Sequence, residues 1–106
     1  MYKFKSKAAG DVLMMESAGD QLLKAIGKEP SDQGIIQAAQ MPAAISAIEQ
    51  AIQADEAARR RAEEAAAAEG RKLPPREGVS LRQRGWPLLE MLKQASRESQ
   101  DVVWGV

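Results

Sequence analysis

The sequence predicts an α+β fold in which a small antiparallel or mixed three-stranded sheet packs against three helices. Three observations lead to this prediction. Polar and apolar side chains alternate over residues 2–6, which is typical of a half-buried strand. Apolar residues recur at steps of three and four in three later stretches, as they do on the buried side of a helix. β-branched and aromatic residues take four of the five positions 102–106. A chain of this length fits one domain, so residues 1–106 are expected to form a single unit.

The first residues predict a hairpin. Residues 2–6 form one strand, 7–11 a turn longer than the two-residue minimum, and 12–15 the second strand. A hairpin alone is marginally stable in water, so we expect a third strand at 102–106 to pair with it. Trp104 is then expected in the core, because it belongs to this strand and the helices cover one face of the sheet.

A first helix of roughly ten residues should follow this hairpin. Ser17 and Asp20 stand three apart, which resembles a capping box with Asp in place of Glu. Gly27 stands where a helix end favours a left-handed residue. After a turn-rich stretch, Ile35 and Ile36 are interpreted as a short buried anchor in a connecting segment.

The middle helix is predicted to be long and partly projecting into solvent. Residues 54–69 contain only Ala, Asp, Glu and Arg, with opposite charges four apart, as in Arg59 and Glu63. A helix over 42–69 would be about 40 Å long, more than so small a core can cover. We therefore predict a charged, Ala-rich extension and a Pro/Gly linker over 54–77, either simply solvated or serving as a docking surface. The apolar stripe that precedes it is Met41, Ala44, Ile45, Ile48 and Ile52.

The last helix should begin after Ser80, since Ser80 and Gln83 form a second capping-box pattern. Pro87 falls inside it and is expected to kink the helix or divide it. Trp86 beside Pro87 is expected to pack against the core, and the alternative is a contact anchor at the rim of an interface.

Residue types that carry most catalytic and metal chemistry are absent. The chain has no His and no Cys, which excludes thiol nucleophiles, disulfides, Ser-His-acid triads and, in practice, structural zinc. The carboxylates considered as candidate bases, Glu49, Glu63, Glu64 and Glu90, are expected on solvated helix surfaces without apolar flanks. We therefore expect no cofactor, no metal and no enzymatic activity. An enzyme based on Lys or carboxylate chemistry is the third-ranked hypothesis, and no residue pattern favours it.

Charge and hydropathy limit the classes of partner. The chain carries 15 basic and 15 acidic residues, so its overall charge does not favour nucleic acid. No stretch approaches the 18 or so apolar residues of a membrane span, and we expect a soluble, cytoplasmic protein. Arg82, Arg84 and Trp86 are the candidate partner-binding residues, because Trp and Arg are enriched at interface hot spots. Together with Lys3 and Lys5 they also suggest, as an alternative, a weak nucleic-acid binder.

Several short motifs in this order resemble a known family. They are Lys3-Phe4-Lys5-Ser6, Ile26-Gly27-Lys28, Gly34-Ile35-Ile36, Met41-Pro42-Ala43-Ala44-Ile45, Ser80-Leu81-Arg82-Gln83-Arg84, Pro87-Leu88-Leu89-Glu90-Met91-Leu92 and Val102-Val103-Trp104-Gly105-Val106. The chain resembles, over nearly its whole length, a small proteobacterial family catalogued as domain of unknown function 1840. The resemblance implies a stand-alone bacterial protein and brings no activity, ligand or catalytic residue. The leading hypothesis is thus a non-enzymatic interaction or accessory protein, with an unidentified protein partner or self-association.

Overall fold

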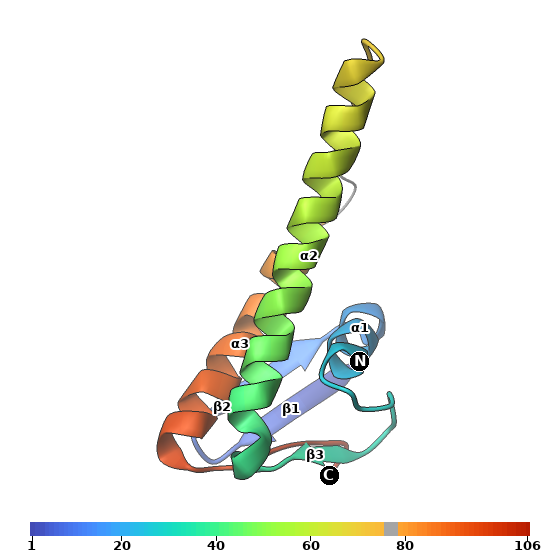
Figure 1. Cartoon of the computed structure of the whole chain (residues 1–106). Coiled ribbons are helices and arrows are strands. Elements are labelled where there is room, and N and C mark those ends of the chain that lie inside the picture. Colours follow the sequence, from blue (N-terminus) through green and yellow to red (C-terminus); the bar gives the residue numbers. More distant parts are fainter. Residues whose placement is uncertain (76–78) are drawn as a thin grey trace.

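Four strands and three helices make up the computed structural model, which describes residues 1–75 and 79–106 (Figure 1). All strand pairs are antiparallel, in the order β2-β1-β4-β3. The elements are β1 (Tyr2–Ser6), β2 (Ala9–Met14), α1 (Glu16–Ala25), β3 (Gly34–Ile36), the short 3₁₀ helix η1 (Ala38–Gln40), α2 (Met41–Ala68), α3 (Leu81–Glu98) and β4 (Val102–Trp104). The α+β class and the three helices are confirmed, and β4 pairs with β1 of the hairpin.

The predicted count of three strands is wrong, because Gly34–Ile36 forms a fourth strand, β3, along β4. Ile35 lies opposite Val103 and Ile36 opposite Val102. Ile36 is fully buried, as expected of an anchor, whereas Ile35 points to the other face and is 39% exposed. Three residues are too few to show an alternating pattern, so this strand is specified by its neighbour β4 and not by local sequence.

The helices cover one face of the sheet and leave the other open. Side chains alternate along each strand, and the buried ones, such as Phe4, Val102 and Trp104, are on the helix side. On the open face lie Lys3, Leu13 and Ile35, all exposed. The sheet residues that enter the core with the helices are Phe4, Met14, Ile36, Val102 and Trp104.

Two local predictions at the start of the chain are wrong. The hairpin turn is the two-residue Lys7–Ala8, and β2 begins earlier than expected, at Ala9. The Ser6 hydroxyl accepts a hydrogen bond from the Ala8 amide (3.2 Å) within this turn, beside an irregularity in the β1–β2 register. Helix α1 begins at Glu16 without any side-chain cap, so Ser17 is inside the helix.

Asp20, the other half of the expected cap, instead contacts β1. Its carboxylate accepts a hydrogen bond from the Tyr2 hydroxyl. That hydrogen bond, together with partial burial, raises the pKa of Tyr2 to about 12. A free tyrosine titrates near 10, so the folded state holds the proton more tightly than the unfolded chain does. The stability from this contact is therefore complete below about pH 10 and is lost as the pH rises through about 12.

Because Tyr2 is the single tyrosine of the chain, tyrosinate absorbance reads this group alone. We expect a midpoint near pH 12 in the native protein and, for Asp20→Asn, a fall of about one unit, since the amide accepts the bond without a negative charge. Asp11→Asn, on the open face of the sheet, is the control and should leave the midpoint unchanged. An unaltered midpoint in Asp20→Asn would show that the carboxylate does not hold the proton.

The middle helix is long, and its second half extends away from the core. Helix α2 has 28 residues and rises well beyond the rest of the molecule (Figure 1). The radius of gyration is 15.7 Å, compared with about 13 Å for a compact chain of this length. Beyond Ile52 only Ala66 is buried, and it lies outside the main core cluster. We call residues 57–75 the arm.

The chain turns at the tip of the arm and packs back along α2. Gly70 is in the left-handed region (φ +72°), and the Arg71 amide donates to the Ala66 carbonyl (2.8 Å), which closes the helix end. Lower down, the Arg59 guanidinium donates to the Pro74 carbonyl (2.6 Å) and to Glu63 (2.9 Å). The predicted linker is therefore attached to the helix through Arg71 and Pro74. Its last expected residues, 76 and 77, lie outside the described ones.

Two predicted helix ends are confirmed, and of the two expectations for Pro87, a kink or a division of the helix, the division is wrong. Gly27 (φ +82°) ends α1, with the Lys28 amide donating to the Leu23 carbonyl (2.9 Å). Ser80 and Gln83 form the reciprocal capping box of α3. Pro87 does not divide α3, which is continuous from Leu81 to Glu98. Pro87 lies on the exposed side of the helix, so its ring has room and the lost hydrogen bond is the main cost.

Candidate functional site

Helices α2 and α3 run side by side in opposite directions and enclose a groove. Glu56 of α2 contacts Arg82 of α3, and Ile52 of α2 lies against Gly85 of α3. Moving back along α2 therefore corresponds to moving forward along α3, so the two helices are antiparallel. Gly85 permits this approach, since a Cβ there would come within 3.2 Å of Leu22 and 3.8 Å of Ile52. The groove encloses about 240 Å³ and is lined by Glu49, Ile52, Gln53, Arg82, Trp86, Leu89 and Lys93.

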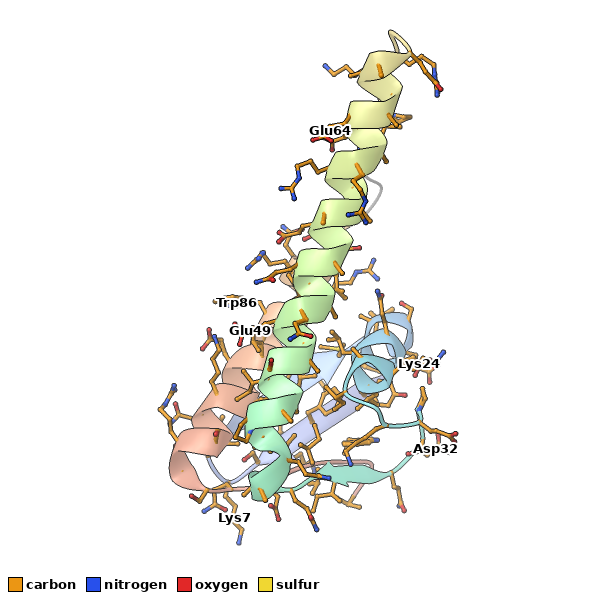
Figure 2. The ribbon with its side chains drawn as sticks, in the orientation of Figure 1. Lys7, Lys24, Asp32, Glu49, Glu64 and Trp86 are labelled. Atoms are coloured by element: carbon orange, nitrogen blue, oxygen red, sulfur yellow. The ribbon has the colours of Figure 1, made fainter. Side chains whose placement is uncertain are left out.

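Trp86 lies at the surface beside this groove and not in the core. Its side chain is 44% exposed, so the expectation of core packing is wrong. The Lys93 ammonium lies 5.7 Å from the centroid of the ring, within the range of a cation–π contact. Figure 2 shows Trp86 at the level of Glu49, beside α2. An indole in this position presents apolar area that solvent still reaches.

Arg82 is fixed by Glu56 at the same groove. Two nitrogens of the guanidinium donate to the two carboxylate oxygens, each at 2.8 Å. The hydrogen bonds and charge of Glu56 raise the pKa of Arg82 further above its ordinary value. Because the two side chains are 47% and 46% exposed, solvent screens the pair, and its main effect is to hold the guanidinium in one orientation.

Arg84, the third sequence candidate, does not join the other two. Residues in a helix advance by about 100° each, so Arg84 points about 200° away from Arg82 around α3. Lys3 and Lys5 are farther removed, since both belong to the open face of the sheet, opposite the helices. Lys3 also pairs with Asp11 (3.6 Å). The structure therefore brings Arg82 and Trp86 together, and the five residues of the nucleic-acid hypothesis do not form one surface.

Comparison with known proteins gives the family. The family model described as "Domain of unknown function (DUF1840)" matches residues 1–104. The chain belongs to this family. No match was found among curated proteins or among solved structures.

The groove of this DUF1840 protein includes residues that the sequence did not single out. Glu49, Ile52 and Lys93 join Arg82 and Trp86, from two helices that are far apart in the sequence. One signal was available, because Arg82, Trp86, Leu89 and Lys93 recur at steps of four, three and four and so share one side of α3. Nothing in the sequence, however, specifies which side of α3 faces α2.

A second hollow, of about 470 Å³, lies at the edge of the open sheet face, where Lys5, Lys7 and Asp101 meet. The Asp101 carboxylate accepts a hydrogen bond from the Ala38 amide (2.8 Å) and so ties β4 to η1. Across residues 1–75 and 79–106, no three acidic side chains gather as a metal site would require. No helix in the same part of the chain is long and apolar enough to cross a bilayer.

Proposed function

We propose that this protein is a small, non-enzymatic interaction or accessory protein of the bacterial cytoplasm, which binds a protein partner in the α2–α3 groove. The observation that carries the proposal is Trp86, a large side chain left 44% exposed beside a formed groove. Interface hot spots are enriched in Trp and Arg, and they cluster around pockets that binding desolvates. Arg82, whose guanidinium Glu56 holds in one orientation, lines the same groove as Trp86.

The size and charge of the groove favour a protein over other ligands. Its volume of about 240 Å³ is below the roughly 300–1,000 Å³ of small-molecule sites, so a single side chain of a partner fits it best. Glu49 on one wall and Lys93 on the other give it mixed charge, which suits a polar rim more than a phosphate backbone. The nucleic-acid alternative is therefore the second candidate.

The test is Trp86→Ala in an affinity capture from the cytosol of the source cells, with nuclease treatment and quantitative mass spectrometry. We expect a specific protein that the native chain retains and that Trp86→Ala loses by about thirtyfold, the effect of removing a hot spot worth about 2 kcal/mol. Ile35→Ala, which truncates another exposed side chain (39%), is the matched control and should retain the partner. Circular dichroism of both variants should match that of the native protein.

Three outcomes would contradict this proposal. Equal recovery of the same proteins by Trp86→Ala would remove the groove from the interaction. Recovery that collapses on nuclease treatment, with binding that falls steeply as salt rises, would favour the nucleic-acid alternative. An empty capture would argue against a stable protein partner altogether.

A further inference from the structure

Strand β2 is an open edge of the sheet and carries few of the usual protections against pairing. It is the first strand in the order β2-β1-β4-β3, and none of the described strands lies on its outer side. Its six residues, Ala9–Met14, include neither Lys nor Pro, which natural proteins often place on exposed edges. Its single charge, Asp11, is compensated by Lys3 on the neighbouring strand (3.6 Å). This edge is therefore free to accept another strand.

Apolar surface remains uncovered on both sides of this edge. On the open face, Leu13 is 63% exposed and Met15, directly after the strand, 62%. On the helix side, a hollow of about 360 Å³ separates β2 from α3, with Val12 and Met91 among its walls. Gly10 contributes no side chain to it, and a Cβ there would meet no atom within 4 Å. A strand added to β2 would lie beside these groups and remove part of their surface from water.

The acidic and basic side chains of α3 beside the hollow would face side chains of opposite charge on a second copy related by a two-fold axis. Glu90 and Arg97 both line the hollow and are seven residues apart, two turns along one side of the helix. A two-fold axis perpendicular to the sheet would pair β2 antiparallel with its copy and set α3 antiparallel to its copy. Glu90 of one protomer then faces Arg97 of its partner, and the same pair recurs on the other side of the axis.

The distances permit this arrangement. Helix α3 packs on β2, the edge strand, more extensively than on β1. Paired strands are about 4.8 Å apart and packed helices about 8–10 Å, so joining two β2 edges brings the two α3 helices within contact range. The net charge of zero adds no long-range repulsion between copies.

We propose that two copies of this chain associate through β2 and α3, forming a two-fold dimer with one continuous sheet and two reciprocal Glu90–Arg97 ion pairs. This surface is distinct from the Trp86 groove, and it is tested on the pure protein without any partner. Failure of the dimer and failure of the proposed function are therefore told apart.

The main test is charge exchange, read by sedimentation velocity over a wide range of concentration. The native protein should show a monomer–dimer equilibrium. Glu90→Arg and Arg97→Glu should each raise the dissociation constant by about tenfold or more, because each places like charges together twice. The double variant should restore it to near the native value. Glu64→Arg and Arg60→Glu make the same charge changes on exposed residues of the arm and should have no effect.

A second variant tests the strand edge itself. Gly10→Lys places a charged side chain in the hollow, where the monomer has room for it, so the variant should fold and remain monomeric. In the native protein, amide hydrogen exchange along β2 should slow as the dimer forms. A native protein that is monomeric throughout would overturn the proposal. So would a dimer that neither Gly10→Lys nor the charge reversals weaken, since it would use another face.

Discussion

Gly34→Ala is expected to destabilise the protein by about 3 kcal/mol, lowering the thermal midpoint by about 15 °C. Gly34 lies opposite Trp104 in the β3–β4 pair, and the indole covers it. A Cβ at this position would stand 2.0 Å from Cζ2 of Trp104 and 2.5 Å from two further ring atoms. The ring cannot move aside easily, because it is 2% exposed and its Nε1 donates to the Ser31 carbonyl (3.0 Å).

Gly10→Ala is the matched control for this substitution. It also exchanges Gly for Ala within a strand, but its Cβ meets no atom within 4 Å. Its stability should be equal to that of the native protein or higher by about 0.5 kcal/mol, because Gly loses more backbone entropy on folding. Urea unfolding of both variants checks the prediction. Equal stabilities for Gly34→Ala and Gly10→Ala would show that the indole does not occupy this place.

Ile48→Ala should produce a loss of similar size, about 3–4 kcal/mol, for a different reason. Ile48 is fully buried in the middle of the apolar stripe of α2, within the core cluster. Truncation removes apolar burial and leaves a cavity that the surrounding helices and sheet fill only in part. Ala favours helix more strongly than Ile does, so the loss cannot come from helix propensity.

Ile45→Ala separates burial from the effect of the substitution itself. Ile45 precedes Ile48 by one turn on the same helix and is only partly buried against the core. We expect its loss to be about 1 kcal/mol, since less apolar area leaves water. The free energies of unfolding of Ile45→Ala and Ile48→Ala are to be measured by chemical unfolding at one pH. If Ile45→Ala cost as much as Ile48→Ala, the stripe would not be oriented as the structure has it.

The sequence predicted the helices well because their signals are local. The stripe through Ile48, the capping box at Ser80 and the left-handed Gly27 each lie within a few residues of the feature they specify. The length of α2 was predictable for the same reason, since residues 54–69 favour helix without any tertiary contact.

The rest of the fold depends on contacts between distant residues. Strand β3 is three residues long and exists because β4 pairs with it. Asp20 could serve as a helix cap by sequence, but Tyr2 takes its carboxylate. The candidate site was predicted in part. Arg82 and Trp86 lie together, but the α2 half of the groove, Glu49 and Ile52, follows only from how two helices pack.

The position of β4 determines when the native sheet can form during synthesis. β4 lies between β1 and β3, and Phe4 pairs with Trp104, one hundred residues later. Until the ribosome has released Val102–Trp104, β1 and β3 have no strand to join them, although α1 and α2 are already available as local structure. Closing so long a loop is slow compared with forming a helix. Completion of the core therefore waits until β4 has been synthesised, and the nascent chain exposes its apolar stripes until then.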